Sequence, residues 1–312
     1  MEDLTSEGLL GGGLLFCDPR FHDVNGIPAG ARWRYEHRSE GRLVGVLDGV
    51  VTDGVFESGY SAPFGGPDLV QDAPTLPDVL GLVDEAVAAM RADGIRMARI
   101  RTRPQVYSVA EPLLEYVLLQ RGFVVELCAL NQHVDLLRLS PGAGPLGLLG
   151  KKRARDVRAD LRLPYELVDA HGGDELDEGH AILAANRAAH GRPTGLAKEY
   201  LLRIRDVFGE RVRMSLLRHA GRPVAAAVVY RVLDDVDLLV NWGDAPEHGL
   251  QRSPMNLLAH LLVERSAGTG ARLLDLGPSS EKDGSPNLGL AHFKRSVGAV
   301  PGTRKVLTLS LA

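Results

Sequence analysis

The chain contains little of what several large protein classes require. Its two cysteines among 312 residues exclude a disulfide framework and fit a reducing compartment. No apolar run approaches the roughly 20 residues of a membrane-spanning helix. The first residues carry Glu and Asp where a secretory signal has positive charge. We therefore expect a cytoplasmic protein without a membrane partner.

A strong charge of one sign is also missing, because the net charge is only −4. This balance does not indicate a DNA-binding protein. The halves differ, however: residues 1–150 carry 12 Lys and Arg against 20 Asp and Glu, whereas residues 151–312 carry 24 against 20. An anionic ligand is therefore expected to favour the second half.

Common catalytic signatures are absent or out of context. There is no G-x-S-x-G nucleophile turn and no H-E-x-x-H, and the ten histidines lack ligand spacing, so no metal is expected. A G-x-G-x-x-G at residues 142–147 does not follow a buried parallel strand, and we interpret it as a hinge. Cys17 and Cys128 stand in apolar sequence, which predicts that both are buried.

What the sequence does contain is an internal repeat. Residues 38–51 and 218–232 each read as a strand, a Gly-Arg turn and a second strand. A helical stretch follows, at residues 76–94 in the first copy and 254–270 in the second, and each leads through a glycine into a short strand. The preserved order of elements indicates a duplicated module.

The region around Ser140 to Gly150 is rich in Gly and Pro and predicts a linker. We therefore divide the chain into an N-terminal domain (1–140), a linker (141–150) and a C-terminal domain (151–312). Helices are predicted at residues 151–161, 174–190 and 198–209. The fold class is α+β, with hairpins and one parallel crossover in each half forming a mixed α/β sheet.

The most informative candidate site lies near the C-terminus. Asp275 ends an apolar strand before a Gly and a polar loop, which is where a sheet presents side chains to a cleft. Lys294 follows in the sequence HFK and could meet an anion or a carboxylate. Alternatively, Asp275 caps a turn and Lys294 is a solvated surface charge.

Two stretches resemble a known family. One is R-x-x-H-x-R-P at residues 187–193, followed by a helix and by G-R-P-V-A-A at 221–226. The other is a strand ending in D-x-G at 275–277, then a polar loop and G-L-x-x-F-K at 289–294. Together they resemble the FemAB-like, or BioF2-like, acyltransferases. The likeness covers about residues 150–312, and the first half matches only through the repeat and the SAPFGG segment at 61–66.

The resemblance implies two tandem GNAT-like (acyl-CoA N-acyltransferase) domains. It implies transfer of an acyl or aminoacyl group from acyl-CoA or aminoacyl-tRNA, as co-substrate, onto an amine of a small-molecule or peptide-like acceptor, without a tightly bound cofactor. Asp275 is then expected to position or deprotonate the amine, and Lys294 to hold an anionic group of the acceptor. The substrate-binding residues expected beside them are Phe64, Tyr230, Asn241, Trp242, Arg252 and Ser253.

One departure from the family bears on the donor. Where GNAT proteins have a glycine-rich pyrophosphate loop, this chain has Gln-Arg-Ser-Pro-Met-Asn at residues 251–256, and proline removes a backbone donor. This fits an aminoacyl-tRNA donor or, alternatively, a catalytically silent GNAT-like binding protein. In the tRNA case phosphates would meet a basic cluster that is otherwise a solvated helix face: Lys151, Lys152, Arg153, Arg155, Arg158 and Arg162.

Overall fold

A computed structural model describes residues 13–69, 74–140, 142, 144–193 and 195–311. The N-terminal half contains α1 (Pro19–Val24), β1 (Arg32–Ser39), β2 (Arg42–Thr52), β3 (Val55–Ser58), β4 (Asp68–Leu69), α2 (Leu76–Ala92), β5 (Met97–Arg101), the 3-10 helix η4 (Gln105–Tyr107), α3 (Glu111–Gln120) and β6 (Val124–Asp135). The C-terminal half contains α4 (Lys151–Asp160), β7 (Tyr165–Asp169), α5 (Gly173–Ala189), α6 (Lys198–Phe208), β8 (Val212–His219), β9 (Arg222–Leu233), β10 (Val236–Asp244), α7 (Met255–Gly268), β11 (Leu273–Pro278), α8 (Leu288–Ser296) and β12 (Val300–Ser310). The helices predicted from the sequence correspond to α2, α4, α5, α6 and α7, and each begins and ends within two residues of the prediction.

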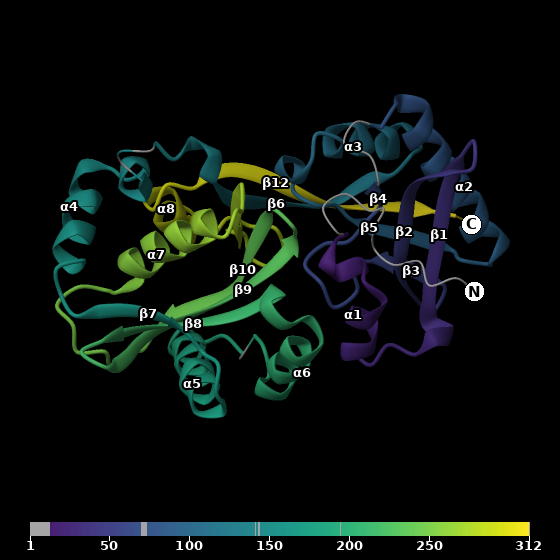
Figure 1. Cartoon of the computed structure of the whole chain (residues 1–312). Helices are drawn as coiled ribbons and strands as arrows, with labels where there is room; N and C mark the ends of the chain where they lie inside the picture. Colours follow the sequence, from purple (N-terminus) through teal and green to yellow (C-terminus); the bar gives the residue numbers. More distant parts are fainter. Residues whose placement is uncertain (1–12, 70–73, 141, 143, 194, 312) are drawn as a thin grey trace.

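These strands form one continuous mixed sheet that passes through both lobes of the molecule (Figure 1). Its order is β1-β2-β3-β5-β12-β6-β11-β10-β9-β8-β7, and β4 pairs with β2. The predicted fold class is therefore confirmed, although the strands of the two halves do not form separate sheets.

The internal repeat is visible in the backbone. The hairpin β1–β2 turns at Glu40-Gly41, with φ of 51° and 80°, and the hairpin β8–β9 turns at Ala220-Gly221, with φ of 48° and 79°. Two consecutive positive φ values are typical of a tight turn whose twist matches that of the flanking strands. In each half a helix then joins two parallel strands: α2 joins β3 to β5, and α7 joins β10 to β11.

The halves exchange their last strands. β12 pairs with β5 and β6, and β6 pairs with β11, so the C-terminal strand lies among strands of the N-terminal half (Figure 1). Residues 300–310 of the second predicted domain thus complete the sheet of the first. The boundaries 1–140, 141–150 and 151–312 stay a prediction, and residues 141 and 143 of the linker lie outside the described part.

The two halves also share a hydrophobic core. One buried cluster combines Phe16 and Phe64 from the first half with Tyr230 and Leu238 from the second. Such packing gives the halves a defined relative position, on which any site between their strands depends.

The cysteines differ from the prediction in one case. Cys17 is buried, as expected, but Cys128 is exposed. Side chains alternate between the faces of a strand, so the apolar neighbours of Cys128 on β6 point to the opposite side from its thiol. Within the described residues, no helix is both long enough and apolar enough to cross a membrane.

Candidate functional site

A cleft opens where two parallel strands of the C-terminal half diverge. β10 and β11 pair from Val236↔Leu273 to Leu238↔Asp275, and beyond this point both strands continue without pairing to each other. The register between β10 and β9 shifts between Leu239 and Asn241, which makes Val240 the extra residue of a bulge. A bulge bends its strand and increases the local twist. The bulge therefore lies where the strands separate, and a pocket of about 620 Å³ occupies the opening, which we call the central cleft.

Lys294 reaches the central cleft from α8. Its side chain is only 2 % exposed, so the alternative of a solvated surface charge is wrong. Nζ donates hydrogen bonds to the carbonyl oxygens of Gly277 (2.9 Å) and Pro278 (2.7 Å) at the end of β11. Burial lowers the pKa of Lys294 to about 7. The nearby Asp275 carboxylate opposes this shift, whereas repulsion from Arg304 lowers the pKa further. A lysine that is partly neutral near pH 7 is suited to proton transfer.

Asn241 and Trp242 line the same cleft from β10, as the sequence predicts. The Trp242 ring lies 5.4 Å from that of Phe293, centroid to centroid, and closes the cleft on the α8 side. Asn241 is 7 % exposed and lines the cleft. Its side-chain amide can donate a hydrogen bond to a ligand that enters the cleft.

The opposite wall comes from the end of α5 and the turn after it. Asn186 donates to the backbone and side-chain oxygens of Asp244, both at 3.0 Å, and so fixes α5 to β10. Gly243 permits this approach, because a Cβ there would lie 2.6 Å from Cγ of Asn186. Arg187, His190 and Arg192 also line the cleft. In the sequence these three residues belong to the R-x-x-H-x-R-P motif, which by itself predicts no role for them in a site.

Asp275 lies beneath the cleft and does not line it. The carboxylate is fully buried and accepts hydrogen bonds from the Tyr107 hydroxyl, the Asn131 amide and the Gly277 N–H, each at 2.7 Å. The Gly277 contact is the turn cap that the sequence analysis kept as an alternative. The role of Asp275 as a base stays a prediction, whereas its structural contacts cross from β11 to both β6 and η4.

A second, basic pocket of about 790 Å³ lies on the other side of α8, between the first turns of α4 and α7. Arg252 and Ser253, predicted to bind substrate, line this pocket and not the central cleft. Nη2 of Arg252 lies 2.5 Å from Oδ1 of Asp160, and Ser253 Oγ donates to Asp244 at 3.0 Å. The other Lys and Arg residues of this basic pocket are Lys151, Lys152, Arg153 and Arg295, and Asp156 and His292 also line it.

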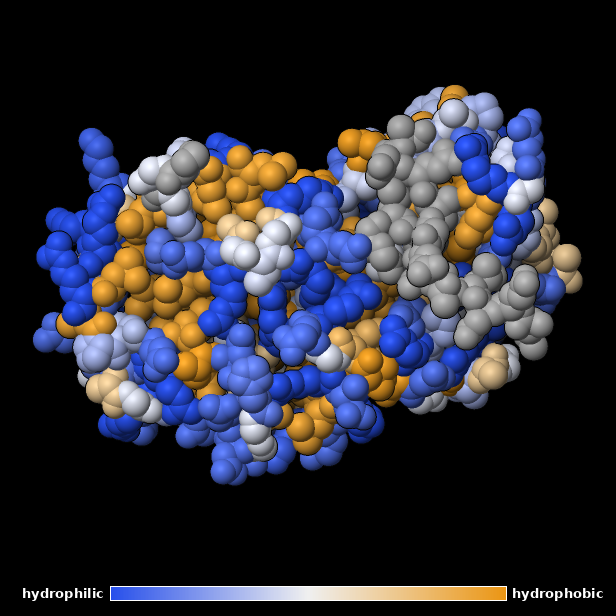
Figure 2. Space-filling model, in the orientation of Figure 1, coloured by the Kyte–Doolittle hydropathy of each residue, from blue (hydrophilic) through white to orange (hydrophobic). Residues whose placement is uncertain are grey.

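The basic helix α4 forms one wall of this pocket. Lys151, Lys152, Arg155 and Arg158 are exposed, whereas Val157 packs into the core. In Figure 2 hydrophilic residues accordingly cover the edge of the C-terminal lobe where α4 lies. Helix N-termini and cations at one pocket favour an anionic ligand.

Two predicted residues lie elsewhere. Tyr230 is buried on β9 and lines a small separate pocket next to the cleft. Phe64 is fully buried in the N-terminal half, where its ring meets those of Phe16 (5.3 Å) and Tyr107 (5.1 Å) between centroids. Phe64 is therefore a core residue and does not line the central cleft.

The N-terminal half has an equivalent divergence, between β3 and β5, but it is filled. Arg101 N–H donates to Ser58 Oγ (2.9 Å) and the Gly65 N–H donates to the Arg101 carbonyl (3.0 Å), which bridges the two strands. A Cβ at Gly65 would lie 2.3 Å from the Gly59 nitrogen, so the intervening loop is closely packed on itself. Among the residues that the structure describes, the C-terminal divergence is the one that holds an open cleft.

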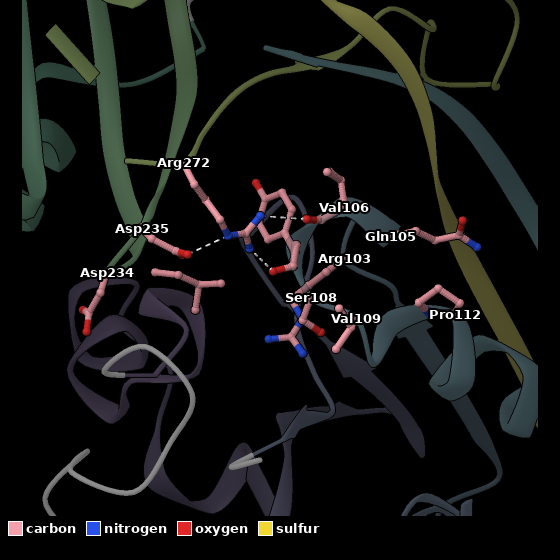
Figure 3. A pocket seen from close by; sticks show the side chains of 11 residues that line it. Arg103, Gln105, Val106, Ser108, Val109, Pro112, Asp234, Asp235 and Arg272 are labelled. Carbon is pink, nitrogen blue, oxygen red and sulfur yellow. Dashed lines mark hydrogen bonds and ion pairs between the residues drawn. The ribbon is translucent and has the colours of Figure 1, made fainter. Parts of the chain in front are cut away.

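A third pocket, of about 830 Å³, lies between the halves (Figure 3). Arg272 extends across it and donates to Asp235 (2.6 Å) and to the carbonyl oxygens of Val106 (3.0 Å) and Tyr107. Arg103 at its edge is buried between Asp68 and Glu111. Because the protein's own acceptors engage these guanidinium groups, we assign the pocket to the junction between the halves. Within the described residues, no group of three or more His, Cys, Asp or Glu is placed to hold a metal ion.

Comparison with known proteins identifies the fold. Residues 151–295 match a family model described as an acetyltransferase (GNAT) domain. The chain is similar to the crystal structure of FemX, with a TM-score of 0.72, 11% identity and coverage of 98% of this chain and 96% of that one. It is also similar to the C-terminal domain of a putative lysylphosphatidylglycerol synthetase from Agrobacterium fabrum, with a TM-score of 0.56, 14% identity and coverage of 88% of this chain and 84% of that one. The chain is similar as well to a tandem GNAT protein from the clavulanic acid biosynthesis pathway, with a TM-score of 0.52, 16% identity and coverage of 93% of this chain and 88% of that one. No curated protein matches the sequence significantly.

Proposed function

We propose that this chain, with a GNAT domain at residues 151–295 and a fold shared with tandem GNAT proteins, is an N-acyltransferase. It transfers an acyl or aminoacyl group from acyl-CoA or aminoacyl-tRNA to an amine of a small-molecule or peptide-like acceptor. The reaction takes place in the central cleft. The observation that carries the proposal is the buried Lys294 amine at the divergence of β10 and β11.

Lys294 acts as the general base in this proposal. A neutral lysine amine has two N–H groups and one lone pair, and the carbonyl oxygens of Gly277 and Pro278 account for two hydrogen bonds. The lone pair is then left for the attacking amine of the acceptor. As the amine nitrogen bonds to the donor's carbonyl carbon, its proton passes to Nζ. Nζ then gives this proton to the CoA sulfur or the ribose oxygen of tRNA as the bond from that atom to the carbonyl carbon breaks.

Asn241 supplies the complementary electrostatic contact. Attack on the donor's carbonyl places negative charge on its oxygen, and fixed donors stabilise that charge best in a site that excludes water. Asn241 lines the cleft beside the bulge at Val240. It is the donor that we assign to the oxyanion.

The basic pocket receives the phosphate groups of the donor. Both donor classes carry phosphates. Helix α8 lies between this pocket and the central cleft: His292 and Arg295 line the pocket, and Phe293 and Lys294 line the cleft. Similarity to a lysylphosphatidylglycerol synthetase domain supports an aminoacyl donor. Similarity to a tandem GNAT protein whose structure is described as without AcCoA supports an acyl-CoA donor.

The test begins with native mass spectrometry of the purified protein with CoA, acetyl-CoA and charged tRNA. Turnover is then measured with the donor that binds and a panel of amines. Lys294→Met is expected to lower kcat/KM by about 10²–10⁴, and wild-type activity should rise with pH through about 7. Lys282→Met, at an exposed lysine outside the cleft, is the matched control. Full activity of Lys294→Met would contradict the assignment.

The same experiment separates an enzyme from a silent binding protein. The proline at position 254, at the start of α7, and the pairing of Arg252 with Asp160 both favour the silent alternative, because they leave few donors free for a pyrophosphate. A silent module would bind a donor without turnover, or would bind none. A donor at 100 times its Kd should add about 2.7 kcal/mol to the stability of a competent protein.

A further inference from the structure

A buried hydrogen-bond network beneath the central cleft connects Lys294 to the N-terminal half. Lys294 Nζ donates to the carbonyl oxygens of Gly277 (2.9 Å) and Pro278 (2.7 Å). The Gly277 N–H in turn donates to the Asp275 carboxylate (2.7 Å), and the same carboxylate accepts a hydrogen bond from the Tyr107 hydroxyl (2.7 Å). These contacts join Tyr107 to Lys294 through residues 275–278, which we call the D-x-G turn.

The D-x-G turn directs two backbone carbonyl groups at Lys294. Gly277 has a φ of 74°, a conformation that residues with a Cβ rarely adopt. The Asp275 side chain caps the turn by accepting from the backbone two residues ahead, as Asp commonly does in turns. The Asp and the Gly of this motif therefore have one combined effect, which is to fix the acceptors that hold the Lys294 amine.

The Asp275 carboxylate in turn depends on donors from the N-terminal half. It is fully buried, and a buried charge is costly unless it is hydrogen-bonded. Asn131 of β6 donates to Oδ1, and Tyr107 donates to Oδ2. Burial raises the pKa of Tyr107 well above its usual value, so the hydroxyl keeps the proton that it donates. Among the described residues Tyr107 is the one hydrogen-bond donor to Oδ2.

A second contact between the halves holds Tyr107 in place. The residue ends η4, and its side chain is only 1 % exposed. Arg272, immediately before β11, donates to the carbonyl oxygens of Val106 (3.0 Å) and Tyr107 (Figure 3). A backbone contact and a side-chain contact thus fix η4 against the strand that ends in the D-x-G turn.

We infer that Tyr107 is a positioning residue for Lys294 and acts through the Asp275 carboxylate and the D-x-G turn. The described residues that line the central cleft all belong to the C-terminal half, so this contact is how the N-terminal half contributes to the cleft. The effect on turnover rests on the proposed function, in which Lys294 is the base. The effect on the surroundings of the Lys294 amine does not.

The turnover test compares Tyr107→Phe, which removes only the hydroxyl, with Gly277→Ala, which strains the positive φ. A Cβ at Gly277 meets no atom beyond its chain neighbours closer than the Leu239 carbonyl oxygen at 3.8 Å, so the strain is confined to the turn. Each variant should lower kcat about 10- to 100-fold and leave the KM of the donor unchanged, because the base is misplaced while the phosphate contacts remain. The double variant should lose little more than the weaker single variant, because both substitutions act on one turn.

Two matched controls carry the same substitutions elsewhere. Tyr116→Phe changes an exposed tyrosine on α3 of the N-terminal half. Gly270→Ala strains a φ of 80° in the loop before β11, outside the cleft. Both controls should keep the wild-type kcat.

A second measurement follows the Lys294 amine without turnover, by NMR titration of protein labelled with ¹³C at lysine Cε. Lys294→Met identifies the signal, which should titrate near pH 7 in the wild type. Asp275→Asn should lower this pKa, because the attraction of the carboxylate for the ammonium group is lost. Tyr107→Phe should raise it, because the hydroxyl no longer offsets part of the carboxylate charge, and should leave it unchanged in the Asp275→Asn background. The other charged or titratable groups around Lys294 stay in every variant: Arg304 on β12 and, lining the cleft from the α5 side, Arg187, His190 and Arg192.

The outcomes separate the inference from the proposed function. An unchanged kcat or an unchanged Lys294 titration in Tyr107→Phe would overturn the inference. So would losses of kcat that multiply in the Tyr107→Phe/Gly277→Ala variant, because the two residues would then act by separate routes. If Asp275→Asn does not fold, this pair of substitutions still gives the answer. Absence of acyl transfer by the wild type with any donor would contradict the proposed function, and the titration of Lys294 would then decide the inference.

Discussion

Replacing Lys294 by Met should change how the stability of the protein depends on pH. The substitution keeps an unbranched apolar side chain of similar length in the same buried position and removes the amine. In the wild type, burial lowers the pKa of Lys294 from 10.5 to about 7. In the unfolded chain the group regains its ordinary pKa near 10.4.

The direction and the size of this change in stability with pH follow from proton binding by residue 294. Between about pH 7 and 10 the unfolded chain holds a proton at residue 294 that the folded chain has released, so the wild type gains stability as the pH rises. Each pH unit is worth 1.36 kcal/mol, and about three units therefore give a gain of about 4 kcal/mol. Methionine binds no proton, so Lys294→Met lacks this gain.

The measurement is urea unfolding of the wild type and Lys294→Met at several pH values from 6 to 10. Other titrating groups occur in both proteins, so the difference between the two unfolding free energies isolates residue 294. Lys282→Met is the control, because Lys282 is exposed and lies outside the cleft. A constant difference for Lys294→Met from pH 7 to 10 would show that Lys294 stays charged in the folded protein, and it could then not serve as a base at neutral pH.

Three further predictions concern other parts of the molecule. Asp275→Asn should lower the unfolding free energy by about 1–3 kcal/mol, because the new amide donor faces donors such as the Tyr107 hydroxyl; unchanged urea unfolding would show that the carboxylate is dispensable for the fold. A thiol reagent should modify Cys128 in the native protein and Cys17 only in urea, and rapid native modification of both would contradict their placement. Arg295→Met should weaken CoA or tRNA binding about tenfold at low salt and less at high salt, as calorimetry can test; equal affinity would remove this residue from the donor site.

Local sequence was sufficient for the elements and for the duplication. The Gly-Arg turns at residues 41–42 and 221–222 predict tight hairpins because a glycine tolerates the positive φ that such turns need. Apolar periodicity predicts α2 and α7, which join parallel strands in the two halves. These signals depend on residues close in sequence, so they could be interpreted without knowing the tertiary contacts.

The candidate site was only partly predictable. Asn241, Trp242 and Lys294 were predicted from the sequence and do line one cleft, but Arg252 and Ser253 line the basic pocket instead. The difference arises because the loop carrying these two residues folds against α4, where Arg252 pairs with Asp160. No local pattern indicates a partner 92 residues away.

What the sequence by itself determined is the kind of module, its duplication and the stretch that carries the cleft. Only the tertiary structure decided which cleft is open and what the charged groups in it experience. β12 crosses into the N-terminal half, and Asp275 accepts a hydrogen bond from the hydroxyl of Tyr107 in that half. Lys294 is buried under the end of β11. The physical reason is that burial and strand pairing depend on segments distant in the chain, whereas periodicity and turn chemistry depend on neighbours. A lysine that looks like a surface charge in sequence therefore becomes a buried amine only when the exchanged strands are in place.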